Sequence, residues 1–270
     1  MQHVGYGKEP VKIDPDLLRH MILNSLRSYN VKFKAEYGEM IIACDGRRYW
    51  RKDINPYYKA NRSKSREESV IDWEVVFQSL DAVREELVEY FPYRVIRFED
   101  TEADDIIGTL CKEYGNTFNK ILIISADKDF RQLQGYMNVF QYDPIQKKMI
   151  VENNPTKYLK EHIMRGDSGD GVTNYLSPSN SLVLKIRQKP ISQKKMEIWL
   201  EQEPEEFCDA EQLRRYRENE LQIDLDKIPE SIHNKIVEEF DRQANKTRSK
   251  LFNYFIKFKL KNLLTDIEQF

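Results

Sequence analysis

Apolar residues recur along the chain with two spacings, and segments of the two kinds alternate. Spacings of three and four residues predict helices over residues 15–37, 72–90 and 101–115. Short apolar runs predict strands over residues 39–45, 93–98, 120–126 and 138–143. After about residue 156 the pattern predicts helices and turns without a clear strand. Strands that alternate with helices are typical of an α/β fold with a mostly parallel sheet.

We therefore predict an α/β core over residues 1–155, in which helices flank a mostly parallel central sheet, and a helical C-terminal domain over residues 156–270. The length of 270 residues suits a core domain with a smaller appendage. Charged residues make up 33% of the chain and aromatic residues 11%, which indicates a globular protein with a highly charged surface rather than a disordered one.

Composition also bears on where the protein works. No apolar run approaches the roughly 18 residues of a membrane span, and the N-terminus lacks the apolar segment of a signal peptide. The cysteines, Cys44, Cys111 and Cys208, are far apart and lack the spacing of a zinc site. We expect a cytosolic protein with free thiols and no membrane partner.

Basic residues gather in blocks, although the formal net charge is only −2. Residues 47–66 hold eight Lys/Arg and one acid, residues 171–196 hold five and no acid, and residues 242–261 hold seven and no acid. Such blocks are typical of a surface that binds a polyanion, and also of solvated helix faces. The first block favours the polyanion, because cations bind phosphates and aromatic rings stack on bases. Its aromatic residues are Tyr49, Trp50, Tyr57 and Tyr58.

Acidic residues follow the ends of the predicted strands. Asp45 ends one strand, and Asp127 and Asp129 follow another, where residues i and i+2 of an extended chain share a side. Further acids stand at the start of a predicted helix and in a turn: Glu102, Asp104, Asp105, Asp167 and Asp170. Because ligand sites of parallel sheets lie at the carboxyl ends of the strands, we expect these acids at one edge. Like charges repel, and oxygen ligands favour magnesium or manganese, so the sequence predicts a metal site for phosphate chemistry.

Each group of acids also has an ordinary structural explanation. Acids in the first turn of a helix complement its dipole. Asp167 and Asp170 flank Gly169 as turn residues do, and Asp45 can begin a loop. Asp127 and Asp129 are the least easily explained in this way. The joint pattern, rather than any single group, favours the metal site.

The order of these motifs resembles the 5′ nuclease (flap endonuclease) family, and most closely its T-even bacteriophage members. The likeness covers almost the whole chain. The segments that carry it are ACDGRRYWRKDINPYYKANR (43–62), SREESVIDWE (65–74), TEADDIIGTL (101–110), KILIISADKDFRQL (120–133), RGDSGDGV (165–172) and the closing LFNYFIKFKLKNLLTDIEQF.

The resemblance implies a nuclease that hydrolyses phosphodiesters with two Mg²⁺ ions, for which Mn²⁺ substitutes, in an in-line displacement. The ligands that it implies for the first ion are Asp45, Glu102, Asp104, Asp127 and Asp129. The ligands that it implies for a second, looser site are Asp105, Asp167 and Asp170. Lys59 and Arg62 correspond to the family's cations that grip the phosphate near the cut.

The same resemblance implies a helical arch at about residues 47–72. A single strand of nucleic acid would pass through the part of the arch formed by residues from about 55 to 72. Tyr57 and Tyr58 would stack on bases there. Further cations of this block would contact nucleic acid: Arg51, Lys64 and Arg66.

Two features depart from the family's pattern. The family begins with a strand that carries a metal-binding aspartate, whereas this chain reaches its first helix at Leu17 without one. Asp14 and Asp16 stand too close to that helix to replace it. We therefore expect a sheet without its central strand and a first metal site that lacks one ligand. Either the natural protein starts upstream of residue 1 or this form is catalytically impaired, and we favour the first explanation.

The second departure follows Asp170, where the chain lacks the glycine-rich hairpin with which many members hold the duplex backbone. Cations in this region would contact the duplex through charge alone, although a solvated loop and helix explain them equally well. They are Lys185, Arg187, Lys189, Lys194 and Lys195.

The activity that the resemblance implies is that of a 5′ to 3′ exonuclease and flap endonuclease with ribonuclease H activity, which removes RNA primers during phage DNA replication. We expect a monomer, in the cytoplasm of an infected bacterial cell, that acts on DNA and RNA–DNA hybrids with a 5′ end or flap. The expected partners are a single-stranded DNA-binding protein and a sliding clamp. Two alternatives stay open: a flap-binding protein that has lost catalysis, and a single-strand ribonuclease of the related PIN-domain type.

Overall fold

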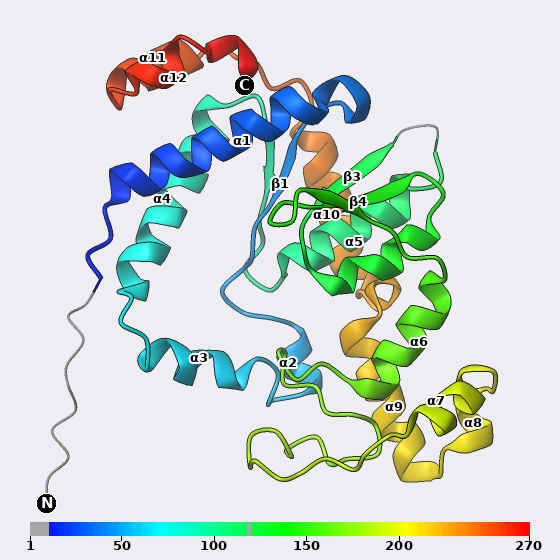
Figure 1. Cartoon of the computed structure of the whole chain (residues 1–270). Helices are drawn as coiled ribbons and strands as arrows, with labels where there is room; N and C mark the ends of the chain where they lie inside the picture. The colour runs from blue at the N-terminus through cyan, green and yellow to red at the C-terminus, as the bar shows by residue number, and fades with distance from the viewer. Residues whose placement is uncertain (1–10, 118–119) are drawn as a thin grey trace, which may run out of the picture. The chain divides into compact units, whose positions relative to one another are not determined.

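The computed structural model describes residues 11–117 and 120–270, whose helices and strands alternate through the first half of the chain (Figure 1). The strands are β1 (Ile41–Ala43), β2 (Arg94–Ile96), β3 (Ile121–Ile124), β4 (Val139–Asp143) and β5 (Lys148–Ile150). The α-helices are α1 (Pro15–Tyr37), α2 (Arg51–Ile54), α3 (Ala60–Glu67), α4 (Trp73–Tyr90), α5 (Ala103–Tyr114), α6 (Pro155–Arg165), α7 (Gln193–Leu200), α8 (Pro204–Phe207), α9 (Ala210–Ile223), α10 (Glu230–Arg242), α11 (Leu251–Lys257) and α12 (Lys261–Leu264). The 3-10 helices are η1 (Lys128–Gly135), η2 (Leu225–Lys227) and η3 (Ile267–Gln269).

Local signals explain where the first long helix begins and ends. The Asp14 carboxylate accepts the N–H groups of Asp16 and Leu17, and Pro15 occupies the first helical position. Gly38 ends the helix with a φ of 82°, a value that a residue with a side chain rarely adopts. The helix predicted over residues 15–37 is therefore confirmed.

The strands form two small sheets instead of one central sheet. β1 pairs with β2, and a second sheet has the order β3-β4-β5. β3 and β4 run parallel, with Ile121 opposite Val139, whereas β5 runs antiparallel to β4. The α/β class is confirmed, but β5 was missed because only three residues form it and they point mostly to solvent. Within the described residues β1 and β3 belong to different sheets.

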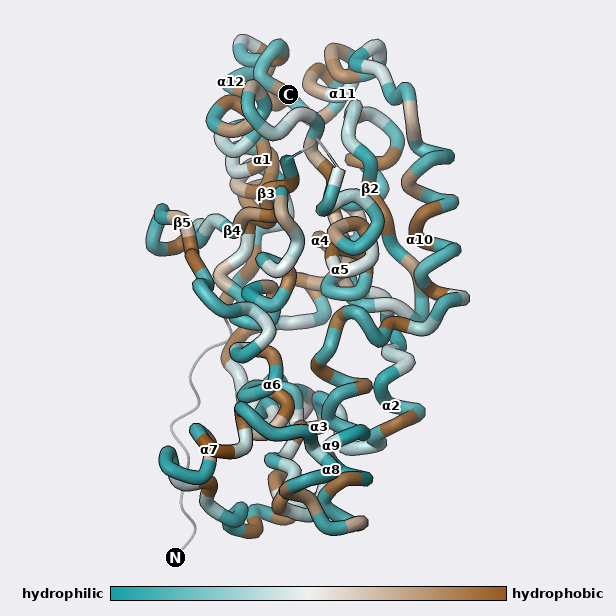
Figure 2. The backbone as a smooth tube through the Cα atoms, turned by 90° about the vertical axis from the view of Figure 1, so that its right-hand side faces the viewer, coloured by the Kyte–Doolittle hydropathy of each residue, from teal (hydrophilic) through white to brown (hydrophobic). Residues whose placement is uncertain are grey.

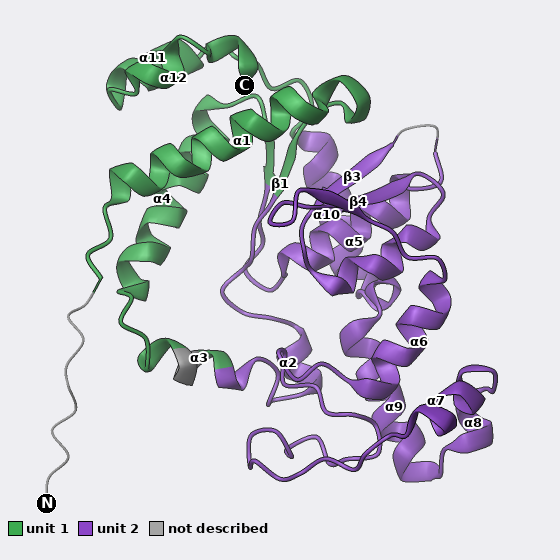
Figure 3. Ribbon diagram, viewed as in Figure 1, with its two compact units in different colours: residues 1–42, 62–95, 243–270 green, residues 43–61, 96–242 purple. Residues whose placement is uncertain are grey.

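The chain divides into two compact units, each built from separate parts of the sequence (Figure 3). Unit 1 comprises residues 1–42, 62–95 and 243–270, and unit 2 comprises residues 43–61 and 96–242. Neither unit ends at the boundary predicted between residues 155 and 156. The physical reason is that elements beyond this boundary pack on elements before it: α6 packs on η1, and α10 packs on α5.

Unit 1 is held by aromatic packing and by ion pairs between its segments, of which Arg19–Glu86 is one. Phe91 is 2% exposed and meets the rings of Tyr254 and Phe270 at centroid distances of 5.0 and 5.7 Å. The Arg19 guanidinium lies 2.9 Å from the Glu86 carboxylate between α1 and α4. These contacts join the N-terminal helix to the C-terminal residues of the chain.

Unit 2 buries α5 between two apolar clusters. One side of α5 presents Cys111 to Ile123 of β3, and the other side presents Ile106 to Ile236 of α10. In Figure 2 apolar and polar residues alternate along α10, as expected of a helix with one buried face. Because both sides of α5 are packed, the position of its N-terminus, which begins at Ala103, is fixed within the unit. No helix in residues 11–117 or 120–270 combines the length and the apolar character that a membrane crossing requires.

Candidate metal centre

The acids at the start of α5 satisfy the first backbone N–H groups of that helix. The Asp105 side chain accepts the N–H of Glu102 at 2.9 Å, and Asp45 Oδ1 accepts the N–H of Ala103 at 2.9 Å. Negative charge at a helix N-terminus is stabilised by the helix dipole. The dipole explanation therefore holds for Asp105, and Asp45 is tied to the same helix end although it comes from the loop after β1.

A buried arginine neutralises two of these acids. Arg51 is 2% exposed, and its Nη1 lies 2.8 Å from Glu102 Oε2 and 2.7 Å from Asp105 Oδ1. Its Nε donates to the carbonyl of Gln222, and the Trp50 indole donates to Asp105 Oδ2 at 3.1 Å. Burial raises the pKa of Asp105, although Arg51 opposes this rise. The expectation that Arg51 contacts nucleic acid is corrected here, because its side chain is enclosed by these partners.

Tyr58 and Lys59 connect the start of α5 to the turn that contains Asp170. The Tyr58 hydroxyl lies 3.1 Å from both Glu102 Oε2 and Asp170 Oδ2. The Lys59 ammonium forms an ion pair with Glu102 and lies 3.4 Å from Asp170 Oδ2. Tyr58 is 3% exposed, so its predicted stacking on bases does not fit this position. Both side chains instead bind carboxylates that are remote in sequence.

The backbone of this connection is strained and tightly packed. Lys59 has a φ of 54°, and its N–H donates to the carbonyl of Asp170 at 2.7 Å. Gly171 has a φ of 78°, and a methyl group there would lie 2.6 Å from the Tyr57 carbonyl oxygen. Glycine is therefore needed for the turn to approach the segment before α3.

Asp127 and Asp129 lie at the start of a 3-10 helix and not at the end of a strand as predicted. β3 ends at Ile124, and η1 starts at Lys128, so the two aspartates do not share an extended strand. The Asp127 carboxylate caps η1 by accepting the N–H of Asp129 at 3.0 Å. Burial raises the pKa of Asp129 to about 6 against the opposing effect of His162, and the neighbouring acids Asp127, Asp167 and Asp170 add to the rise.

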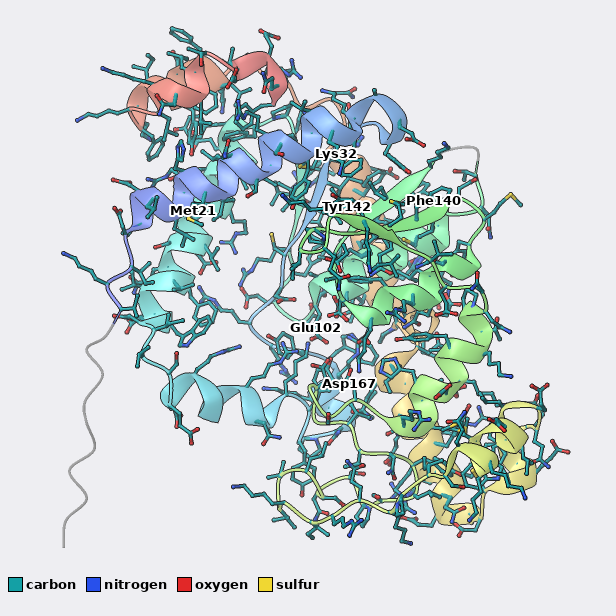
Figure 4. The ribbon with its side chains drawn as sticks, viewed as in Figure 1. Met21, Lys32, Glu102, Phe140, Tyr142 and Asp167 are labelled. Carbon is teal, nitrogen blue, oxygen red and sulfur yellow. The ribbon has the colours of Figure 1, made fainter. Side chains whose placement is uncertain are left out.

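Asp104 lies near Glu102 at its own helix end and near the two aspartates at the start of η1. Burial and then the nearby acids Glu102, Asp127 and Asp129 together raise its pKa to about 8, against the opposing effect of Lys59. A carboxylate with such neighbours is costly to ionise unless a cation compensates it. The acids from α5, η1 and the turn after α6 thus gather as predicted in one region of unit 2, where repulsion favours a divalent ion. Figure 4 labels Glu102 at the start of α5 and Asp167 in the turn after α6.

His162 of α6 joins the cluster, although no sequence signal marks it beyond its place just before the GDSGD motif. Its Nδ1 lies 3.6 Å from Asp129 Oδ1, and its Nε2 lies 3.5 Å from Asp167 Oδ2. Lys128 Nζ lies 2.9 Å from Asp167 Oδ2. Burial would raise the pKa of Asp167, but nearby His162 and Lys128 hold it below its ordinary value. Asp167 also accepts the N–H of Gly169 at 2.8 Å, so its role as a turn residue is confirmed too.

The donor set fits divalent cations. It offers carboxylate oxygens from three segments, which hard cations such as Mg²⁺ and Mn²⁺ prefer. Among the described residues, Asp129 Oδ1 and both ring nitrogens of His162 are buried without a hydrogen-bond partner. Buried polar atoms of this kind are normally satisfied by a partner, and a bound ion would supply one.

The remaining predicted nucleic-acid contacts differ in exposure. Arg62 and Arg66 are exposed on α3 in unit 1, and the side chain of Lys64 is outside the described residues. Tyr57 is half-buried. Cations on the loop before α7 and on α7 itself are all exposed: Lys185, Arg187, Lys189, Lys194 and Lys195.

The loop that carries the first three of these cations is held by its own hydrogen bonds. The Asn174 N–H donates to Gln188 at 2.7 Å, and the Lys189 N–H donates to the Ser177 hydroxyl at 2.9 Å. The loop therefore presents its cations from a fixed base within unit 2.

Two family descriptions match the chain and together span most of it. Residues 18–163 match the 5′-3′ exonuclease, N-terminal resolvase-like domain, and residues 156–270 match the C-terminal domain of T4 RNase H. Ribonuclease H of Enterobacteria phage T4 is 35% identical over 271 residues, which cover 96% of this chain and 88% of that protein.

Other relatives match about half of the chain. DNA polymerase I of Rhizobium leguminosarum is 34% identical over 131 residues, which are 46% of this chain and only 12% of the polymerase. Flap endonuclease Xni of Shewanella sp. strain MR-4 is 29% identical over 135 residues, which are 46% of each chain.

Solved structures of a phage T5 protein share the fold. A T5 protein co-crystallised with metal ions superposes with a TM-score of 0.60 at 16% identity, covering 86% of this chain and 96% of that one. A complex of the T5 flap endonuclease with DNA and metal ions superposes with a TM-score of 0.56 at 16% identity, covering 82% and 90%. At this level of identity the likeness shows the fold alone.

Proposed function

The chain belongs to the 5′-3′ exonuclease family and is similar to ribonuclease H of phage T4 over nearly the whole length of the chain. On this basis we propose that it is a divalent-metal-dependent 5′ nuclease of phage DNA replication. Its enzyme class is that of a nuclease that hydrolyses phosphodiester bonds. The proposed task is the removal of RNA primers from lagging-strand fragments, by 5′ to 3′ exonuclease, flap endonuclease and ribonuclease H activity.

The acid cluster of unit 2 carries this proposal. The side chains that would hold the ions are Asp104, Asp127, Asp129, Asp167 and Asp170. Two Mg²⁺ ions, or Mn²⁺ in their place, would stabilise the negative charge that develops when a P–O bond of the substrate breaks. The convergence of Asp129, His162 and Asp167, whose ligand atoms lie within 4.8 Å of one another, is the observation that favours cation binding most strongly.

Other predicted residues would act around the ions. We propose that Asp105 and Arg51 hold the start of α5 in place, because each is buried against the other at 2.7 Å. Glu102 and Asp45 remain ligand candidates at the same helix end. The Lys59 ammonium pairs with Glu102 inside the cluster. When an ion binds Glu102 instead, Lys59 would be released to contact the phosphate of the substrate.

The proposed substrates are DNA and RNA–DNA hybrids with a 5′ end or flap. The name of the phage T4 relative and the DNA bound to the phage T5 flap endonuclease support this range. Arg62, Lys64 and Arg66 of α3, with Tyr57, would contact the single strand. The exposed cations from Lys185 to Lys195 would contact the duplex backbone. A single-stranded DNA-binding protein and a sliding clamp are the proposed partners of the monomer.

A flap-binding protein with impaired cleavage is the second candidate. Glu102, a predicted metal ligand, already pairs with the cations Arg51 and Lys59, which favours this candidate. A single-strand ribonuclease fits less well, because the family match continues through residues 156–270.

Cleavage of a 5′-labelled, RNA-primed flap duplex tests the proposal. The full chain should cut it with Mg²⁺ or Mn²⁺ and stop when EDTA is added. Asp129→Asn should lower the rate by about 100-fold or more, because a metal ligand supports charge in the transition state. Asp241→Asn is the matched control outside the cluster and should cut normally. Cleavage that persists in EDTA would overturn the proposal, and tight flap binding without cleavage would favour the second candidate.

A further inference from the structure

We propose that His162 is itself a metal ligand and that it forms, with Asp129 and Asp167, a mixed nitrogen–oxygen site that prefers Mn²⁺ and other transition-metal ions to Mg²⁺. The role of the ion in catalysis rests on the proposed function, whereas the site itself is defined by the three side chains.

The three side chains converge from separate elements. Asp129 comes from η1, His162 from α6 and Asp167 from the turn after α6. One ligand atom from each lies within 4.8 Å of the others. Asp129 Oδ1 is 3.6 Å from one ring nitrogen, and Asp167 Oδ2 is 3.5 Å from the other.

These separations are longer than those of good hydrogen bonds. A nitrogen and an oxygen in a good hydrogen bond are about 2.7–3.2 Å apart. Two donors that each lie about 2.1 Å from one ion are about 3.0–3.5 Å apart, depending on the coordination geometry. The distance from Nε2 to Asp167, 3.5 Å, is at the top of that second range, and the distance from Nδ1 to Asp129, 3.6 Å, is just beyond it. Because the two distances involve different ring nitrogens, only one of these nitrogens would bind the ion, and Asp129 Oδ1 and Asp167 Oδ2 would complete the set within 4.8 Å.

The histidine ring also lacks the partners that a structural histidine would have. Its side chain is 6% exposed, and within the described parts of the chain neither ring nitrogen has a hydrogen-bond partner. Asp129 Oδ1 is buried and equally unsatisfied there. Buried polar atoms seldom remain so without a ligand, an ion or water. Tyr158 meets the ring edge-on at a centroid distance of 5.9 Å, which limits its rotation.

Lys128 opposes an ion at this place, because its ammonium lies 2.9 Å from Asp167 Oδ2. Its side chain is 50% exposed, so it can swing into solvent when a divalent ion arrives. The exchange replaces a single positive charge by a double one beside Asp129 and Asp167.

A nitrogen ligand changes which ion the site selects. Mg²⁺ binds oxygen ligands and keeps much of its water, whereas imidazole is a good ligand for transition metals. An all-carboxylate site would lack this bias. We therefore expect His162 to favour Mn²⁺ over Mg²⁺ at this position.

Pulsed electron paramagnetic resonance of Mn²⁺ bound to the full chain tests the assignment without any nuclease assay. The Mn²⁺ signal should show coupling to a directly bound ¹⁴N, and the coupling should change to that of ¹⁵N when histidine is ¹⁵N-labelled. It should vanish in His162→Gln and persist in His233→Gln, a matched control on α10 beside Glu113. Circular dichroism and a thermal melt would verify that both variants fold.

Calorimetric titration adds a second readout. His162→Gln should weaken Mn²⁺ binding by about 10-fold or more and change Mg²⁺ binding less. Saturable Mn²⁺ binding without nitrogen coupling in the unaltered chain, or no Mn²⁺ binding at all, would overturn the assignment and leave His162 as an ion-pair partner of the two aspartates.

The outcomes separate this inference from the proposed function. Flap cleavage with Mg²⁺ and no nitrogen coupling would leave the nuclease proposal intact and reject the histidine ligand. Nitrogen coupling without cleavage of any 5′ flap would establish the metal site and reject the nuclease proposal.

Discussion

Replacing Arg51 by methionine removes the cation that neutralises two buried carboxylates. Arg51 is 2% exposed, and its partners Glu102 and Asp105 are 1% and 0% exposed. Glu102 keeps Lys59 and Tyr58 as partners, but the Arg51 guanidinium is the only cation within ion-pair distance of Asp105 among the described residues. Breaking a buried pair by removing one member costs about 3–5 kcal/mol, because the remaining charge stays buried without compensation.

The free energy of unfolding should therefore fall by about 3–5 kcal/mol in Arg51→Met, and the melting temperature by about 6–20 °C. The pKa of Asp105 is already raised by burial and should rise further without Arg51. A carboxyl whose pKa is higher in the folded state than in the unfolded one stabilises the fold below its unfolded pKa and loses this effect as pH rises. The variant should thus be least stable at alkaline pH and recover partly on acidification.

Urea titrations at pH 5.5, 7 and 8.5 would measure these changes. Arg187→Met is the matched control, because Arg187 is an exposed cation and its loss should change stability by less than about 0.5 kcal/mol. If Arg51→Met unfolded at the same urea concentration as the parent chain and only weakened DNA binding, the buried-pair argument would be refuted. The original expectation of a nucleic-acid contact would then stand for Arg51.

Three further predictions concern other parts of unit 2. Without metal, the free energy of unfolding should fall as pH rises towards about 8, because the pKa of Asp104 is about 8 in the folded chain. Thermal melts in EDTA would measure this, and Asp104→Asn should flatten the pH dependence. An unchanged slope in that variant would contradict the raised pKa of Asp104. Gly171→Ala should lower the free energy of unfolding by about 1–3 kcal/mol and slow cleavage, because the added methyl group would lie 2.6 Å from the Tyr57 carbonyl oxygen. Gly135→Ala should be tolerated in the same melts, because the nearest atom to its methyl group would be 3.9 Å away. Lys189→Met should lower the slope of log Kd against log salt by about 1 for a flap duplex, measured by fluorescence anisotropy, and an unchanged slope would remove this residue from the duplex surface.

The long helices could be predicted because their signals are local. The helix predicted over residues 72–90 is α4, Trp73–Tyr90, and the helix predicted over 101–115 contains α5, Ala103–Tyr114. The capping acids and the apolar spacing that define them lie within each segment. The strand predicted over 120–126 was too long, since β3 ends at Ile124 and Asp127 caps a 3-10 helix that starts at Lys128.

The arrangement of the site could be predicted only in part. The acids around η1 and α5 were expected together, because strand ends of one sheet meet at one edge. Arg51 was misplaced because it stands in a basic block that is typical of an exposed surface, whereas its partner Glu102 is 51 residues away. His162 was missed because its place beside Asp129 depends on how α6 packs on η1, which no local pattern encodes.

The central claim is that the acid cluster of unit 2 binds divalent ions for phosphodiester hydrolysis. The most direct measurement is the cleavage rate of the 5′-labelled, RNA-primed flap duplex by the full chain at increasing Mg²⁺, with Asp129→Asn and Asp241→Asn beside it. We expect a rate that rises with Mg²⁺ and saturates in the parent chain and in Asp241→Asn, and that stays about 100-fold lower in Asp129→Asn. Equal rates in all chains, or cleavage that does not depend on Mg²⁺, would contradict the claim.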